Sequence, residues 1–69
     1  MRLRQIERVA AFRLDMAVFM DELSNPTTPK NTLRNTRRYI ERRWRIDPLS
    51  LLERAAEEEF SRRVSENAP

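Results

Sequence analysis

The sequence predicts an all-α fold, a compact three-helix domain that spans residues 1–69. Glycine is absent, which excludes tight hairpins of the Asn-Gly type because their turns need positive φ angles. Arginine, glutamate, leucine and alanine are abundant, and all four are compatible with helices. Apolar residues recur at three- and four-residue steps in three segments, separated by two breaks that contain proline. These observations place helices at about residues 3–24, 30–46 and 48–65.

The first predicted helix is apolar over more than half of its circumference. A helix with such a wide apolar face is either central in its fold or part of an oligomer interface. We therefore expect an interface that uses apolar side chains of this helix and one of the third helix: Ile6, Phe12, Met16, Phe19, Met20 and Leu51. Arg13 falls inside the apolar face, either as a side chain at its rim or as an ion-pair partner for a glutamate of the third helix.

The second predicted helix follows a loop in which Pro26 and Pro29 interrupt helix formation. We expect Thr28 to cap this helix with Pro29 as its first residue, or Asn31 to cap it slightly later. Its apolar face is thin and consists of three side chains that we expect to be buried: Leu33, Ile40 and Trp44.

The third predicted helix begins at the clearest cap in the sequence. Asp47 can accept hydrogen bonds from the free N–H groups of the first turn, and its negative charge suits a helix N-terminus. Pro48 fits the first helical position, where its missing N–H group is not needed. An apolar stripe then follows along one face of the helix: Leu49, Leu52, Ala56, Phe60 and Val64.

A chain of 69 residues buries only a small core, and its stability is marginal without an additional constraint. Cysteine and histidine are both absent, which excludes disulfides and thiolate or imidazole zinc sites. Self-association is the remaining way to bury more apolar surface, so we expect a homodimer. No apolar run is as long as a membrane span. We expect a cytoplasmic protein that needs no cofactor and does not interact with a membrane.

Basic residues are concentrated in the middle of the chain, although the net charge is only +3. On a helical wheel, four arginines form a line opposite the apolar face of the second helix: Arg34, Arg38, Arg42 and Arg45. Arg37 lies on the side of the apolar face. We predict six side chains as contacts to nucleic acid: Lys30, Arg34, Arg37, Arg38, Arg42 and Arg45. Guanidinium groups one turn apart suit the phosphates and base edges of DNA or RNA. The alternative is that the line pairs with the acidic third helix, at Glu57, Glu58 and Glu59.

Two arrangements would bring this line to a nucleic acid. In the first, residues 16–24 support residues 29–46 as the recognition helix of a helix-turn-helix. The segment KNTLRNTRRYI resembles such helices in its polar start, its arginines and its apolar anchor. The proline-containing break is, however, longer than the usual turn of that motif and lacks its common glycine. In the second, an arginine-rich helix binds structured RNA, with Tyr39 or Trp44 stacking on bases.

Catalysis is not expected from this sequence. Without histidine or cysteine the usual pairs of nucleophile and base cannot form, and adjacent glutamates on a helix point too far apart to hold one metal ion. We therefore predict a small, basic, nucleic-acid-binding or regulatory protein. The alternative is a helical adaptor or inhibitor of another protein, similar in size to antitoxin-like and phage-type inhibitors, which docks through its first or third helix.

Overall fold

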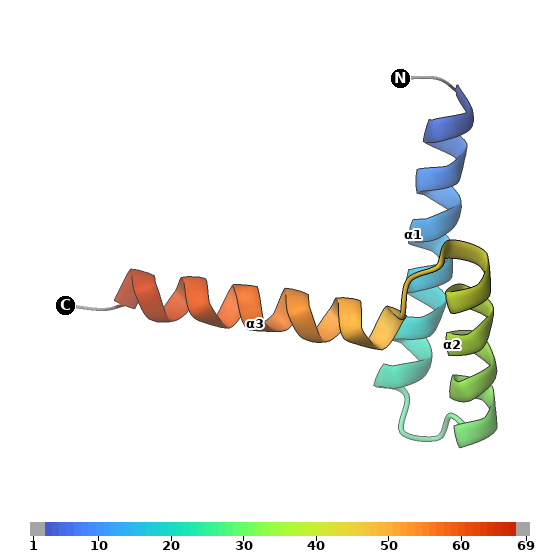
Figure 1. Cartoon of the computed structure of the whole chain (residues 1–69). Coiled ribbons are helices and arrows are strands. Elements are labelled where there is room, and N and C mark those ends of the chain that lie inside the picture. Colours follow the sequence, from blue (N-terminus) through green and yellow to red (C-terminus); the bar gives the residue numbers. More distant parts are fainter. Residues whose placement is uncertain (1–2, 68–69) are drawn as a thin grey trace.

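A computed structural model describes residues 3–67, with only the backbone of Leu3 (Figure 1). Its three helices are α1 (Leu3–Ser24), α2 (Lys30–Trp44) and α3 (Pro48–Asn67). The all-α prediction with three helices is confirmed for these residues. The remaining residues of the predicted domain, 1–2 and 68–69, lie outside the described part of the chain.

Helices α1 and α2 lie side by side and run antiparallel, as Figure 1 shows. Asp15 of α1 contacts Trp44 of α2, whereas Glu22, further along α1, contacts Thr36, which precedes Trp44. The helices of a helix-turn-helix cross at roughly 90–120°. The helix-turn-helix arrangement is therefore wrong, because the long break lets α2 fold back along α1.

Helix α3 begins beside the middle of α1 and extends away from the α1–α2 pair (Figure 1). The radius of gyration is 15.0 Å, whereas a compact chain of this length has a radius of about 11 Å. The predicted compact domain is therefore wrong. The physical reason is that α3 packs on the pair through its first turns only, so most of its length has no neighbour among residues 3–67.

The core lies where the three helices meet, a region that we call the corner. Met16 and Phe19 of α1 are buried there against Ile40 of α2, which has no exposed surface. Half-buried apolar side chains from all three helices surround them: Phe12, Leu33, Trp44, Leu49, Leu51 and Leu52. Of the three side chains predicted to be buried on α2, Ile40 is thus fully buried, and Leu33 and Trp44 are half-buried.

The loop between α1 and α2 is closed by the side chain of Asn25. Its carbonyl oxygen accepts hydrogen bonds from the backbone N–H of Thr27 at 3.0 Å and from the Thr27 hydroxyl at 2.7 Å. Pro29 itself occupies the N-cap position of α2 and makes no capping hydrogen bond with its side chain. The predicted caps at Thr28 and Asn31 are therefore wrong. The carbonyl of Pro29 accepts the first bonds of the helix, so the helix begins at Lys30.

Helix α2 ends at Trp44, two residues before the predicted end at residue 46. Arg45 terminates it by adopting a left-handed conformation, with φ 58° and ψ 31°, and donates its N–H to the carbonyl of Glu41 at 2.9 Å. Glycine usually fills this position because other residues meet a steric cost there of roughly 1–2 kcal/mol. The chain has no glycine, so an arginine takes the position. Helix α3 continues to Asn67, beyond the predicted end at residue 65.

The predicted cap at Asp47 is confirmed. One carboxylate oxygen accepts the N–H of Leu49 at 3.2 Å, and the other accepts the hydroxyl of Ser50 at 2.8 Å. Arg37 of α2 also donates to both oxygens, from Nε at 2.9 Å and from a terminal nitrogen at 2.8 Å. These hydrogen bonds, that of Arg37 foremost, lower the pKa of Asp47 to about 2. Asp47 therefore starts α3 and at the same time ties it to α2, while Pro48 is buried at the junction.

Candidate functional site

The outer face of α2 carries a set of cations that we call the arginine face, defined as Lys30, Arg34, Arg38 and Arg42. All four side chains are exposed. The three arginines lie outside because Ile40, on the far side of the helix from them, points into the core. The three arginines follow one another at four-residue steps, which places them about 6 Å apart along the helix axis.

The arginine face is not neutralised within residues 3–67. None of its four cations makes an ion pair with an acidic side chain there. The alternative prediction, that it pairs with the acidic third helix, does not hold within one described chain. Glu59 instead pairs with Arg62 and Arg63 of its own helix, and α3 extends away from α2. Like charges one turn apart destabilise a helix by a few tenths of a kcal/mol for each pair.

The two cations on the flanks of α2 contrast with the arginine face. Arg37 donates to Asp47 and lies 3.2 Å from the carboxylate of Glu41, and these contacts raise its pKa, chiefly through the hydrogen bond to Asp47. The structure thus places Arg37, predicted as a nucleic-acid contact, in the joint between α2 and α3. Arg43 pairs with Asp15 at 3.2 Å and donates to the hydroxyl of Tyr39 at 2.9 Å.

Trp44 belongs to the packing between α1 and α2. Its indole N–H donates to Asp15 at 2.8 Å, and its ring meets Phe12 edge to face with centroids 5.4 Å apart. The guanidinium groups of Arg43 and Arg8 lie over the same ring, at 4.9 Å and 6.0 Å from its centroid. These contacts, together with the half-buried position of the ring, make Trp44 part of the packing between α1 and α2.

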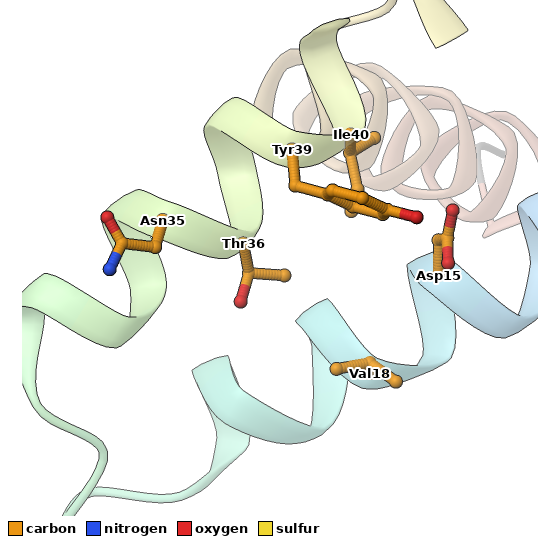
Figure 2. A pocket seen from close by; sticks show the side chains of 6 residues that line it. All are labelled: Asp15, Val18, Asn35, Thr36, Tyr39 and Ile40. Carbon is orange, nitrogen blue, oxygen red and sulfur yellow. The ribbon is translucent and has the colours of Figure 1, made fainter. Parts of the chain in front are cut away.

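Tyr39 lies beside the arginine face and is 53% exposed. It borders an open groove between α1 and α2, where its hydroxyl points toward Asp15 and Val18 forms part of the opposite wall (Figure 2). Asn35 and Tyr39 also line a second hollow on the outer side, together with Arg38, Arg42 and Arg43. Asn35 and Arg43 were not among the predicted site residues, although their helical-wheel positions next to Arg38 and Arg42 are a signal in the sequence.

Arg45 lies apart from the arginine face. It follows the end of α2 in the left-handed conformation, so it does not continue the helical spacing of the three arginines. It lines a hollow at the start of α3 with Asp47, Ser50 and Arg54. The prediction that it completes the line of arginines assumed a helix that continued to residue 46.

The six predicted interface residues fall into two groups. Met16 and Phe19 are buried in the core of the chain, while Phe12 and Leu51 are half-buried against it. These four side chains are already covered by the chain itself. The other two, Ile6 and Met20, are each 49% exposed.

Two further findings concern the described residues as a whole. In residues 3–67, no group of three or more acidic, cysteine or histidine side chains is placed to hold a metal ion. None of the three helices, within that range, is long and apolar enough to cross a membrane. Comparisons of the chain with protein-family models, with curated proteins and with solved structures found no match.

Proposed function

We propose that this protein binds nucleic acid as a homodimer, and that each chain contacts phosphates through its arginine face. The observation that supports this proposal is the division of cations around α2. Arg37 and Arg43, on its flanks, each have an acidic partner, whereas the arginine face has none within residues 3–67. An uncompensated line of guanidinium groups on a rigid helix costs some stability in the free protein, and polyanion binding recovers it.

The arginine face suits a phosphate backbone better than a single base. Its cations are exposed, and Arg38 and Arg42 line an open hollow with Asn35, Tyr39 and Arg43. Such a surface meets phosphates at the edge of a groove in duplex DNA or structured RNA. Tyr39 is the exposed aromatic side chain at its border and would stack on a nearby unpaired base.

The salt dependence of binding tests this proposal. Each phosphate contact contributes roughly −0.9 to the slope of log K against log salt for duplex DNA. Four contacts for each chain predict a slope of about −3.6, and about twice that value for a dimer that uses both faces. The double variant Arg38→Gln, Arg42→Gln should reduce the magnitude of the slope by about two units for each chain. Fluorescence anisotropy over a series of salt concentrations measures both slopes.

A matched control removes the same charge elsewhere. The double variant Arg62→Gln, Arg63→Gln removes two arginines that pair with Glu59 on α3, and it should leave the slope nearly unchanged. Equal losses in both double variants would show that net charge alone drives binding. If the unmodified protein binds neither DNA nor RNA at about 50 mM salt, where such contacts are strong, the proposal is wrong.

A second candidate function is supported by the apolar surface outside the corner. Phe60 and Val64 of α3 are exposed large apolar side chains, as are Ile6 and Val9 of α1. An adaptor or inhibitor that docks through these helices on another protein would use this surface. Capture of a partner from the native host that survives nuclease treatment, by a protein with no affinity for nucleic acid, would favour this function over the first.

A further inference from the structure

We propose that two copies of this chain dimerise by exchanging arms, with the free part of α3 from each copy lying antiparallel along the free part of α1 from the other. The α1 arm is residues 4–13 and the α3 arm is residues 53–67. Both arms leave the corner in different directions and do not meet within one chain (Figure 1). The inference rests on the proposed homodimer and specifies its interface.

The chain exposes more surface than a compact monomer of the same mass. The chain exposes 6233 Å², whereas a compact monomer of 8.3 kDa exposes about 4,600 Å². The excess of roughly 1,600 Å² for each chain corresponds to about 3,200 Å² for two chains, within the range of roughly 2,000–5,000 Å² for obligate homodimers. A second copy is therefore large enough to cover the excess.

Four of the exposed large apolar side chains are on the arms, and others lie along the rest of α1: Leu14, Val18, Met20 and Leu23. Phe60 is 68% exposed and Val64 is 52% exposed on the α3 arm. Ile6 and Val9 are exposed on the α1 arm. The α3 arm thus carries exposed apolar side chains at helical spacing, and the α1 arm carries Ile6 and Val9, of which Val9 borders Trp44 and Ile46. Exposed apolar surface of this kind is what helix pairing buries.

The two arms are complementary in charge. The α1 arm has three arginines and one glutamate: Arg4, Glu7, Arg8 and Arg13. The α3 arm has five glutamates and three arginines: Glu53, Arg54, Glu57, Glu58, Glu59, Arg62, Arg63 and Glu66. Two α1 arms or two α3 arms would bring like charges together, whereas an α1 arm and an α3 arm attract each other. Charge therefore favours the exchange over a dimer of like helices.

The spacing of the residues gives the register. Ile6 and Arg13 are seven residues apart on one face of α1, and Glu53 and Phe60 are seven residues apart on one face of α3. When the helices run antiparallel with Ile6 opposite Phe60, Arg13 comes opposite Glu53. The small side chains of Ala10 and Ala56 then face each other between these two contacts and let the helices approach closely. Arg13, a cation within an apolar face, gains an acidic partner that it lacks within residues 3–67.

An antiparallel exchange is also consistent with the symmetry of a dimer. Within one chain, helix α1 runs toward the corner and helix α3 runs away from it (Figure 1). A two-fold axis that bisects the angle between the arms places each α3 arm along the partner's α1 arm in opposite directions. Both contacts form at once, and each copy gives and receives one arm, as a closed two-fold interface requires.

Charge reversal with rescue tests the inference. Sedimentation equilibrium at tens of micromolar should show a dimer for the unmodified protein. Arg13→Glu and Glu53→Arg should each raise the dissociation constant at least tenfold, because each change creates two like-charge contacts. An equimolar mixture of these two variants should form a heterodimer of nearly the original affinity, since both contacts then join opposite charges. Phe60→Ala should also weaken the dimer at least tenfold.

Controls keep the outcomes distinct. Arg54→Glu, on a different face of α3, should leave the dissociation constant within about threefold, and its circular dichroism should show the same helix content as the unmodified protein. A monomeric unmodified protein would overturn both the homodimer and the arm exchange. A dimer that is insensitive to Arg13→Glu and Glu53→Arg, or a mixture that fails to associate, would overturn the arm exchange alone. The salt dependence of nucleic-acid binding is a separate measurement and tests the arginine face by itself.

Discussion

The corner and the two arms differ in how their side chains are used. In the corner, Phe19 and Ile40 are buried, and the polar groups around them have partners, such as Asp15 with the indole of Trp44 and Asp47 with Arg37. On the arms, large apolar side chains are exposed. An isolated helix without tertiary contacts is only marginally stable in water. The comparison shows that the corner alone stabilises the single chain, while the arms depend on what covers them.

The corner should be broken most strongly by Ile40→Ala. Ile40 is fully buried, so its truncation leaves a cavity at the centre of the core and should destabilise the fold by roughly 2–5 kcal/mol. Urea denaturation at one fixed chain concentration measures the change, because the stability of a dimer depends on concentration. Val18→Ala, at an exposed position on α1, is the matched control and should cost about 0.5 kcal/mol or less. Equal effects of the two changes would contradict the location of the core.

The joint between the corner and the α3 arm should be weakened by Asp47→Ala. The change removes the cap of α3 and its link to α2, and we expect a loss of about 1–2 kcal/mol. The same denaturation experiment measures it, with Ser65→Ala at an exposed position near the end of α3 as the control. An unchanged midpoint for Asp47→Ala would mean that the cap does not stabilise α3.

The contribution of Asp47 should depend on pH. Its pKa is lowered to about 2 in the folded protein, below the usual value of 3.8. The ionised carboxylate therefore stabilises the fold above about pH 4, and this contribution, on the order of 1 kcal/mol after solvent screening, is lost as the pH falls toward 2. Urea midpoints of the unmodified protein and Asp47→Asn should differ at pH 5, and the difference should shrink as the pH falls to 2. A difference as large at pH 2 as at pH 5 would contradict the assigned ionisation.

The same comparison explains how far the sequence could predict the structure. The helices, the buried Ile40 and the cap at Asp47 follow from local spacing and local chemistry, and these predictions are confirmed. The direction of α3 depends instead on long-range contacts, such as the Arg37–Asp47 hydrogen bonds, that no local pattern encodes. The predicted compact domain was therefore wrong.

The candidate site shows the same division. Helical spacing correctly placed Arg34, Arg38 and Arg42 on one exposed face, because these residues lie in the interior of α2. It could not separate them from Arg37, whose acidic partner Asp47 is distant in sequence. Arg45 was misplaced because a left-handed arginine is rare, and the absence of glycine hid the end of the helix.

The end of α2 should be stabilised by Arg45→Gly. Glycine adopts the left-handed conformation without the steric cost that arginine meets, so we expect a gain of about 1 kcal/mol. Arg54→Gly, within α3, is the control and should instead destabilise by roughly 0.5–1 kcal/mol. Thermal denaturation followed by circular dichroism distinguishes the two signs. Destabilisation by Arg45→Gly would contradict the conformation at the end of α2.

The smallest effect on stability is expected at the arginine face. Arg38→Gln removes an exposed charge with no ion-pair partner among residues 3–67. The free energy of unfolding should change by at most about 0.5 kcal/mol, and we expect a small gain because repulsion from the neighbouring arginines is removed. Urea denaturation at low salt is the sensitive measurement, because salt screens the repulsion. A loss well above that value would show that Arg38 has a structural partner and is not available for binding.

The fork of hydrogen bonds between Arg37 and Asp47 has a mechanical consequence. Helix α3 is about 30 Å long, and its base is fixed by these hydrogen bonds together with the buried Pro48 and the packing of Leu49 on the core. A rotation of about 10° at the base would displace the far tip by roughly 5 Å, close to one helical turn. Two parallel bonds resist twisting better than one, since the planar guanidinium and the carboxylate must stay nearly coplanar. The direction of α3 relative to α1 and α2 therefore depends on the contacts of its first turn.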